Sequence, residues 1–336
     1  MTKSGFGTVD GVAVDEIALR SNAGATAKII TWGAVVRDLV VPTTSGGPQR
    51  VVLGLNSLQD YIAHSPHFGA VPGRYANRIA NGRFVLDGKE HALDKKPGDK
   101  DTLHGGPHGF GRRIWTLASY DEQSATLTLR SPDGEAGFPG ALEARCVYRL
   151  IEPATLRVEF AATTDKPTVV NLTQHSYFNL DGSPDVLDQE VTLFADFYTP
   201  SDADLIPTGE IRSVAGTPYD FRRPRRVRNA GGTAYDTNFV VRPPLDPDGL
   251  APVAHVFSPR NGLTLSLFST APGVQFYDAA KLSVPVEGLG GARYGAHAGL
   301  CLEPQAFPDS PNRRHFTDTV LRPGETYRAV SEFRFA

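Results

Sequence analysis

A histidine stands among amides and hydroxyls near the middle of the chain, in the segment NLTQHSYFNL at residues 171–180. Side chains of an extended strand alternate between two faces. In a strand, Ser176 lies on one face and His175 on the other, together with four further polar groups: Asn171, Thr173, Tyr177 and Asn179. An imidazole titrates near neutral pH and suits proton transfer, while amides and hydroxyls suit a polyhydroxylated ligand. The alternative is a strand whose polar face is solvated or hydrogen-bonded within the fold.

A carboxylate stands in a similar pattern near the C-terminus, in GLCLEPQAFPDSPN at residues 299–312. Alternation puts Glu303 on the face opposite Leu300 and Leu302. Pro304 favours an extended conformation at Glu303 and removes a ladder donor directly after it. The segment therefore predicts Glu303 at the end of a strand, where its apolar neighbours raise its pKa toward that of a useful general base. The alternative is a surface glutamate at a strand end.

Two loop-like segments carry further polar groups. In LHGGPHGFG at residues 103–111, the glycines let the backbone turn sharply and approach a ligand, which directs His104 toward a pocket. The histidines of this segment suggest a metal, but no neighbouring cysteine or carboxylate pattern supports one. In GRYANRIANG at residues 73–82, Asn77 stands beside Arg78. A guanidinium next to an amide grips vicinal hydroxyls or a carboxylate, although a structural salt bridge is the simpler role for such an arginine.

Two other polar segments are less specific. YDTNF at residues 235–239 sets Asp236 between aromatic residues, an arrangement that suits contact with a sugar. RRPRRVR at residues 222–228 is similar to a nucleic-acid patch, but it has no interleaved aromatic residues and favours a solvated loop.

The balance of charge limits the classes of partner. The 336 residues include 34 basic and 37 acidic groups, a net charge of −3, which argues against a dedicated nucleic-acid binder and against a polybasic membrane surface. The two cysteines, Cys146 and Cys301, give no disulfide framework and fit a reducing compartment. The N-terminus lacks the apolar run of a signal peptide, and no stretch approaches the ~18 apolar residues of a membrane span. We expect a soluble, cytoplasmic protein, and the oligomeric state stays open.

Short alternating segments dominate the rest of the chain. The 34 glycines and 26 prolines divide it into many pieces. Alternation predicts strands at residues 27–30, 35–41, 50–53, 83–86, 125–129, 144–151, 155–161, 190–194, 238–241, 263–267 and 327–335. The best helical candidate is residues 56–63. A boundary near residues 160–168 is conceivable, but Asp165-Lys-Pro167 suits a turn. The pattern predicts an all-β fold of many short, mostly antiparallel strands with few short helices, in a single domain over residues 1–336.

Taken together, these segments resemble the aldose 1-epimerase (galactose mutarotase) family. The resemblance rests on segments that occur in the family's order along nearly the whole chain: GRYANRIANGRF at 73–84, LHGGPHGFGRRIW at 103–115, DGEAGFPG at 133–140, NLTQHSYFNL at 171–180, IPTGEI at 206–211, YDTNF at 235–239, PGVQFYDA at 272–279, GLCLEPQAFPDSPN at 299–312 and LRPGETY at 321–327. The resemblance implies a single β-supersandwich with the sugar in an open cleft.

The same resemblance implies roles for individual residues. His175 matches the family's general acid and Glu303 its general base. The positions that match sugar-binding residues are Asn77, Arg78, His104, Ser176, Tyr177, Asp236 and Gln275. No metal and no cofactor is expected. Three departures from the family pattern concern substrate preference: Pro304 where threonine is common, Thr237 where histidine is common, and Pro72 before the first Gly-Arg.

The resemblance therefore predicts interconversion of the α and β anomers of a free aldose such as galactose or glucose. Three alternatives belong to other classes. A glycosidase would use Asp236 and Glu303 as its carboxyl pair. A carbohydrate-binding module would need no matched acid and base. An epimerase of a pentose or a sugar phosphate stays open, because the sequence does not show where Arg112, Arg113 and Arg293 point.

Overall fold

Three antiparallel sheets organise the chain in the computed structural model, which describes residues 2–43, 47–229, 231–244 and 249–336. In spatial order, the five-stranded sheet contains β1 (Thr2–Val9), β2 (Val12–Arg20), β3 (Thr26–Ile30), β4 (Val35–Val41) and β5 (Gln49–Arg50). The nine-stranded sheet contains β10 (Thr116–Tyr120), β11 (Ser124–Ser131), β12 (Leu142–Ile151), β13 (Thr155–Thr164), β26 (Tyr327–Phe335), β22 (Thr264–Ser269), β21 (Ala251–Phe257), β16 (Glu190–Leu193) and β19 (Arg225–Arg226). The six-stranded sheet contains β15 (Tyr177–Phe178), β24 (Leu300–Gln305), β23 (Gly273–Tyr277), β20 (Asp236–Val240), β17 (Phe197–Thr199) and β18 (Arg212–Ser213).

Smaller elements connect these sheets. The two-stranded pairs are β14 (Thr168–Val169) with β25 (Val320–Leu321), β6 (Arg78–Ile79) with β9 (Thr102–Leu103), and β7 (Arg83–Leu86) with β8 (Lys89–Ala92). The single-turn 3₁₀ helices are η1 (Ala80–Gly82), η2 (Phe110–Arg112), η3 (Glu135–Gly137), η4 (Leu289–Gly291) and η5 (Ser310–Asn312). Among the described residues, α1 (Leu58–His64) is the one α-helix. None of the described helices is long and apolar enough to span a membrane.

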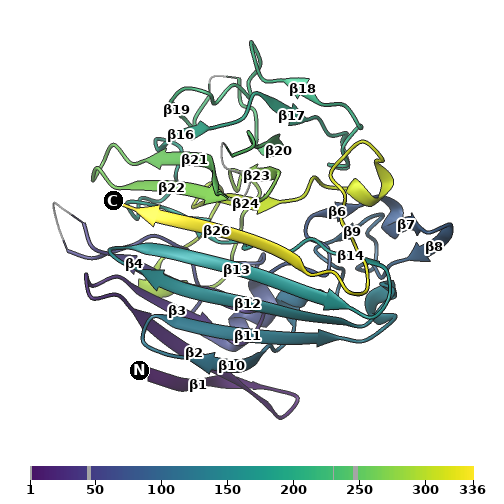
Figure 1. Ribbon diagram of the computed structural model, residues 1–336. Coiled ribbons are helices and arrows are strands. Elements are labelled where there is room, and N and C mark those ends of the chain that lie inside the picture. The colour runs from purple at the N-terminus through teal and green to yellow at the C-terminus, as the bar shows by residue number, and fades with distance from the viewer. Residues whose placement is uncertain (1, 44–46, 230, 245–248) are drawn as a thin grey trace.

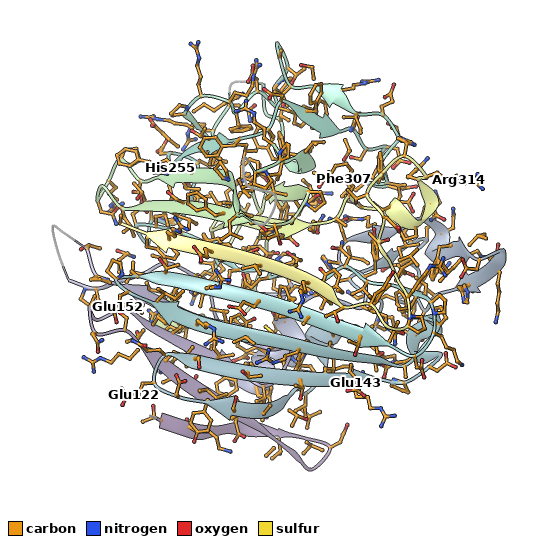
Figure 2. The ribbon with its side chains drawn as sticks, in the orientation of Figure 1. Glu122, Glu143, Glu152, His255, Phe307 and Arg314 are labelled. Carbon is orange, nitrogen blue, oxygen red and sulfur yellow. The ribbon has the colours of Figure 1, made fainter. Side chains whose placement is uncertain are left out.

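The nine-stranded sheet packs against both of the other large sheets. It crosses the front of the molecule in Figure 1, with β26 between β13 and β22. Its buried side chains join those of the five- and six-stranded sheets in one continuous apolar cluster, which extends from Ile17 in β2 to Phe335 in β26. Exposed carboxylates such as Glu143, on β12, and Glu152, in the turn after it, lie at the ends of these strands (Figure 2). The sheets are thus held together by apolar contacts between segments far apart in the sequence.

The six-stranded sheet has two different faces, because its side chains alternate. In β24, Leu300 and Leu302 enter the apolar cluster between the sheets, and Cys301 and Glu303 point the other way. In the neighbouring β23, Val274 and Phe276 likewise join the core. The second face of this sheet therefore carries polar groups that the core does not use.

A side-chain cap and one buried side account for the start and the packing of the helix α1. The Ser57 hydroxyl accepts a hydrogen bond from the backbone N–H of Asp60 at 3.1 Å, and Leu58 and Tyr61 bury one side of the helix. The helix ends before Ser65, whose extended conformation is the one favoured before Pro66. The helix predicted at residues 56–63 is confirmed with its start two residues later.

The predicted all-β fold of antiparallel strands is confirmed, and every predicted strand segment overlaps an observed strand. One local prediction was wrong. Residues 169–180 do not form a half-exposed strand, because every one of them is buried. Within this segment, strands are present only at Val169, which ends β14, and at Tyr177–Phe178, which form β15. The middle of this segment is joined to the rest of the fold by isolated bridges, Tyr75 with Asn171 and Ala70 with His175.

Candidate active site

A cleft of about 350 Å³ opens on the polar face of the six-stranded sheet. Its walls come from loops around β6, β9 and β15 and from strands β20, β23 and β24. The lining includes most of the residues that the sequence singles out: Asn77, Arg78, His104, His175, Tyr177, Asp236 and Glu303. These side chains come from five separate parts of the sequence, so only the folded sheet brings them together.

Two buried polar groups of the cleft, an imidazole and a carboxylate, lie in contact. His175 Nε2 lies 3.4 Å from Glu303 Oε2, and the side chains are only 6% and 3% exposed. The backbone of His175 is fixed by two hydrogen bonds of 2.9 Å, from its N–H to Ala70 and from the Gly69 N–H to its carbonyl. Glu303 is fixed by pairing with Gln275 across β24 and β23. The pair therefore sits on rigid backbone from both sides.

Pro304 had predicted that Glu303 lies at the end of a strand. In the structure, Glu303 lies inside β24. The strand continues through Pro304 to Gln305. Within the described residues, β15 pairs with only two residues of β24, Leu300 and Cys301, so one edge of β24 has no strand beside it at Pro304. A residue without an N–H is tolerated at such an edge.

Burial shifts the pKa values of both groups. It raises the pKa of Glu303 well above its usual range, and the negative charge of Asp236 adds to this effect while Arg78 opposes it. Burial lowers the pKa of His175 to about 4. Both shifts favour the uncharged forms. The pair therefore favours a neutral carboxyl beside a neutral imidazole.

His104 presents a defined tautomer to the cleft. The backbone N–H of Asn77 donates to His104 Nδ1 at 3.0 Å. Burial, with the nearby His67 and His175, lowers the pKa of His104 well below its usual value, so the ring is neutral and its proton is on Nε2. One donor atom each from His104, His175 and Glu303 lies within 4.8 Å of the others, a spacing that suits a metal. Neither nitrogen of His104 has a free lone pair, however, so this ring suits a ligand oxygen better than a metal ion.

The loop that carries Arg78 is held from two sides. Arg78 pairs with Leu103 in the ladder of β6 and β9, and the His104 N–H donates to the Asn77 carbonyl at 2.9 Å. From the other side, the Asp309 N–H donates to the Arg78 carbonyl at 2.8 Å. These contacts place Asn77, Arg78 and His104 as one unit.

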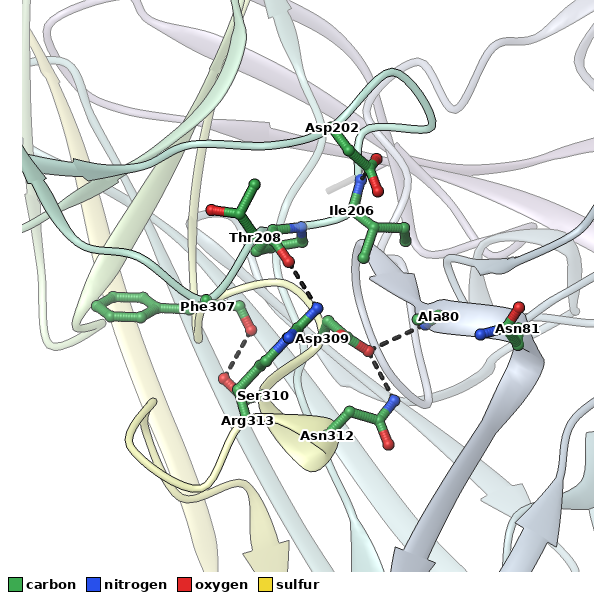
Figure 3. A network of polar contacts seen from close by, with 12 residues as sticks. Ala80, Asn81, Asp202, Ile206, Thr208, Phe307, Asp309, Ser310, Asn312 and Arg313 are labelled. Atoms are coloured by element: carbon green, nitrogen blue, oxygen red, sulfur yellow. Dashed lines mark hydrogen bonds and ion pairs between the residues drawn. The ribbon is translucent and has the colours of Figure 1, made fainter.

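A buried carboxylate anchors this unit to the C-terminal part of the chain (Figure 3). Asp309 is fully buried and accepts hydrogen bonds from the Ala80 N–H at 3.0 Å and from Asn312 Nδ2 at 2.7 Å. Arg313 Nε donates to its second oxygen at 3.1 Å. Asp309 thus supports the arginine loop without lining the cleft, which gives the PDSPN segment a structural role.

Asp236 and Gln275 form a second polar pair. Gln275 Nε2 donates to Asp236 Oδ1 at 2.6 Å. Asp236 lines the cleft, whereas Gln275 is 4% exposed and does not belong to the lining. In this structure Gln275 therefore orients the Asp236 carboxylate.

Ser176 lies outside the cleft. Its hydroxyl accepts a hydrogen bond from Gln174 Nε2 at 2.7 Å, and its N–H donates to Gln174 Oε1 at 3.0 Å. Gln174 in turn donates to the Gly69 carbonyl. Strict alternation at residues 175–177 explains this position, because it directs His175 and Tyr177 to the cleft and Ser176 away from it.

The arginines left open by the sequence also have defined positions. Arg113 pairs with Glu135 at 2.5 Å, and Arg293 pairs with Glu287 at 3.4 Å. Arg112 donates to the Ile62 carbonyl at 3.2 Å. None of the three lines the cleft as the described residues form it.

Comparisons with known proteins show to which family this chain belongs. A model of the aldose 1-epimerase family matches residues 15–334. The chain belongs to the aldose 1-epimerase family. It is 41% identical to galactose mutarotase of Bos taurus, over 99% of this chain and 95% of the bovine protein, and 37% identical to aldose 1-epimerase of Escherichia coli strain K12, over 97% and 96%. A solved structure of the GalM/aldose epimerase homologue from C. elegans superimposes with a TM-score of 0.90 at 30% identity, covering 96% of this chain and 99% of that one.

The structure adds cleft residues that the family resemblance did not bring forward. Several of them are aromatic: His67, Tyr219, Tyr235 and Tyr277. Lys281 also belongs to the lining. Aromatic rings provide flat apolar surfaces against which the C–H groups of a sugar can pack. The signal for His67 was present in the sequence as SPHFGA at residues 65–70, where proline and glycine predict a tight turn directly before the Asn77–Arg78 segment.

The position of Arg78 leads to a prediction for this aldose 1-epimerase family member. Arg78→Ala is expected to lower kcat/KM by about 10- to 1000-fold, because each charge-assisted contact with a sugar hydroxyl contributes roughly 1.5–3 kcal/mol. Steady-state kinetics on the variant will measure the loss, and the melting temperature will show whether the fold is retained. A folded variant with unchanged kinetics would remove Arg78 from the binding site.

Proposed function

We propose that this protein is an aldose 1-epimerase that interconverts the α and β anomers of a free monosaccharide, with Glu303 as general base and His175 as general acid. The observation that carries the proposal is the contact of these two buried groups, 3.4 Å apart, at the base of a cleft lined by hydroxyl-binding side chains. An acid and a base close to one another can serve the two oxygens that are bonded to C1 of a cyclic sugar.

The reaction requires two proton transfers in each direction. The pair enters its active form when its one proton passes from Glu303 to His175. Glu303 then removes the proton of the C1 hydroxyl while His175 protonates the ring oxygen, the bond between C1 and the ring oxygen breaks, and C1 becomes an aldehyde. Rotation about C1–C2 and the reverse transfers close the ring on the other face of the carbonyl. Proton count and charge balance without an oxidant or a covalent intermediate.

The other cleft residues have distinct roles in this proposal. The Nε2–H of His104 donates to a sugar oxygen, while Asn77, Arg78 and Asp236 hold hydroxyl groups as the ring opens. Tyr177 packs against the imidazole of His175, with ring centroids 5.2 Å apart. Gln275 acts through Asp236, and Ser176 has no direct contact with the sugar in this arrangement.

The alternatives receive less support from the cleft. A sugar-phosphate epimerase would need cationic groups for the phosphate besides Arg78. Lys281 is the one further lysine or arginine in the lining that the described residues provide, and Arg112, Arg113 and Arg293 lie outside it. A binding module would have no use for the paired His175 and Glu303. A glycosidase would use Asp236 and Glu303, and release of free sugar from an aryl galactoside would reveal it.

Polarimetry on freshly dissolved α-anomers tests the proposal. Catalytic amounts of the protein should accelerate the approach to the equilibrium rotation for at least one of D-galactose, D-glucose, D-xylose and L-arabinose. Denatured protein provides the control for buffer catalysis. If no aldose equilibrates faster than its spontaneous rate, the proposed function is wrong.

The pKa shifts predict the pH dependence of kcat/KM. The active pair holds one proton. Binding of a second proton, governed by the pKa of His175 near 4, removes the base at low pH. Loss of the one proton, governed by the raised pKa of Glu303, removes the acid at high pH. A bell-shaped profile is expected, after correction for the spontaneous rate, whose acid limb lies near pH 4 and whose alkaline limb lies well above the ordinary carboxyl pKa. An acid limb near the ordinary imidazole value of about 6.5 would contradict this assignment.

We also propose that the chain acts as one domain in the cytoplasm. The single-domain proposal is supported by the apolar cluster shared between the three large sheets. The cytoplasmic proposal is supported by Cys146 and Cys301, which are both buried and unpaired, as in a reducing compartment.

A further inference from the structure

Cys301 lies against the imidazole of His175. Its sulfur is 3.6 Å from His175 Nδ1, a distance that suits a hydrogen bond with the larger sulfur atom, and His175 Nε2 lies 3.4 Å from Glu303 Oε2. Cys301 and Glu303 stand two residues apart in β24, so both side chains leave the strand on its polar face. Each nitrogen of the imidazole is therefore in contact with a different side chain of the same strand.

The fold fixes the thiol in this position. Cys301 is fully buried and pairs in register with Tyr177 on one side and with Tyr277 on the other. It does not belong to the lining of the cleft as the described residues form it. Burial raises the pKa of the thiol well above its usual value, so the group stays uncharged. Cys301 is thus placed to contact His175 and not the sugar.

The remaining groups around the imidazole do not bond to Nδ1 through their side chains. Three further rings contact it, with centroids 5.2, 5.2 and 5.8 Å away: Tyr177, His104 and His67. Among the described residues, no hydrogen bond joins any of these rings to Nδ1. The carbonyl of His175 itself acts to raise the pKa of its ring, but this oxygen already accepts a hydrogen bond from the Gly69 N–H at 2.9 Å. Cys301 is thus the side chain that faces Nδ1.

The proposed reaction requires one particular tautomer of His175. The carboxyl of Glu303 transfers its proton to Nε2, so Nε2 must have a free lone pair before the transfer. A neutral imidazole has one N–H, which must then be on Nδ1. The same condition holds after Nε2 has given its proton to the ring oxygen of the sugar. The Nδ1 proton is therefore never transferred, and it needs an acceptor that keeps it in place.

We propose that Cys301 is a positioning residue that accepts the Nδ1–H of His175 and so keeps Nε2 as the nitrogen that transfers protons. This inference rests on the proposed function. A thiol sulfur is a weak, uncharged acceptor. It orients the ring but, unlike a carboxylate in the same place, it adds no charge that would stabilise the imidazolium. The imidazolium formed during turnover is therefore a strong acid toward the ring oxygen.

The tautomer of His175 is measurable without any sugar. ¹⁵N NMR of histidine-labelled protein distinguishes a protonated ring nitrogen from one with a free lone pair. The chain has nine histidines, so the His175 signals are identified by their loss in His175→Asn. At neutral pH the wild type should carry the proton of this ring on Nδ1. A proton on Nε2 would mean that Nδ1 is not a donor to the thiol, and it would overturn the proposal.

Variants of Cys301 separate the hydrogen bond from packing. Cys301→Ala removes the acceptor, whereas Cys301→Ser retains one as a hydroxyl oxygen. Cys146→Ala is the control for lost packing, because it deletes the other buried thiol, on β12 and outside the cleft lining. Steady-state kinetics, the tautomer of His175 and the melting temperature are measured for each protein.

The expected result depends on the acceptor. Cys301→Ala should lower kcat by about 5- to 20-fold, the size of one lost hydrogen bond, with KM within about 2-fold of the wild type. Its His175 should be a mixture of the two tautomers. Cys301→Ser should keep the proton on Nδ1 and turn over within about 3-fold of the wild type, and Cys146→Ala should match the wild type in both respects. Equal losses of kcat in Cys301→Ala and Cys301→Ser, or wild-type turnover in Cys301→Ala, would overturn the role of Cys301.

Failure of this proposal is distinguishable from failure of the proposed function. Absence of anomeric exchange with the wild type on every aldose would reject the function. A wild type that exchanges anomers but holds the His175 proton on Nε2 would reject the role of Cys301 alone. If Cys301→Ala does not fold, Cys301→Val fills the volume without an acceptor and takes its place in the same comparison.

Discussion

Glu303→Gln is expected to lower kcat by about 10²- to 10⁴-fold while sugar binding remains measurable. An amide cannot accept the proton of the C1 hydroxyl, but it preserves the size of the carboxyl group. Because burial favours the neutral carboxyl, the neutral amide should also preserve stability, and the melting temperature is expected to stay the same or rise. Kinetics by polarimetry, sugar binding by calorimetry and thermal unfolding measure the three quantities.

A matched control shows whether the loss depends on the position of the glutamate and not on the Glu→Gln change itself. Glu143→Gln changes an exposed glutamate on β12 (Figure 2) that does not belong to the cleft lining, and should leave turnover within about 2-fold of the wild type. If Glu303→Gln binds sugar and also turns it over at a near-normal rate, Glu303 is not the base. Asp236, beside it in the cleft, would then be the next candidate.

His175→Asn is expected to have a loss of the same order, about 10²- to 10⁴-fold in kcat. Asparagine retains a polar group of similar reach but cannot carry the proton to the ring oxygen. The control is His255→Asn on β21, where Nδ1 contacts the Ser266 hydroxyl at 3.0 Å outside the cleft lining. This control should keep full turnover even if it costs some stability.

The double variant distinguishes a coupled pair from two independent groups. If His175 and Glu303 act in one transfer, Glu303→Gln with His175→Asn should be little worse than the worse single variant, because either change already breaks the transfer. If the two groups contributed independently, the loss in kcat of the double variant would instead be the product of the two single losses. Near-normal turnover in His175→Asn would make His104 the next candidate acid.

The sequence was most informative where side chains alternate over a half-exposed strand. Residues 144–151 and 155–161 were predicted as strands and lie in β12 and β13. The strand β1 was not predicted, because most of its side chains are exposed and it has no apolar period to detect. At residues 171–180 the alternation of side chains predicted a half-exposed strand that the structure does not contain. This segment is buried on both sides, and polar side chains such as Asn171 form hydrogen bonds with other parts of the chain.

The candidate site was predictable in its chemistry but not in its geometry. Residue types and family resemblance were enough to select His175 and Glu303, and the structure brings the two together. The sequence did not show that Ser176 bonds to Gln174, that Gln275 binds Asp236, or that Pro304 lies inside β24. The first of these is a local contact between residues two apart. The other two depend on which strands become neighbours, and that is set by contacts between distant segments. His67 was missed for the same reason, since only the fold places its turn beside His175.

Anomeric exchange at equilibrium tests the central claim most directly. Saturation of the α-anomeric proton of D-galactose, observed at the β-anomeric proton, reports interconversion without any net reaction. The measurement uses wild-type protein, Glu303→Gln and His175→Asn at sugar concentrations where binding has been confirmed for each. Transfer of saturation is expected with the wild type and should fall to the spontaneous level with both variants. Persistent transfer with either sugar-bound variant would contradict the assignment of His175 and Glu303 as the acid and base.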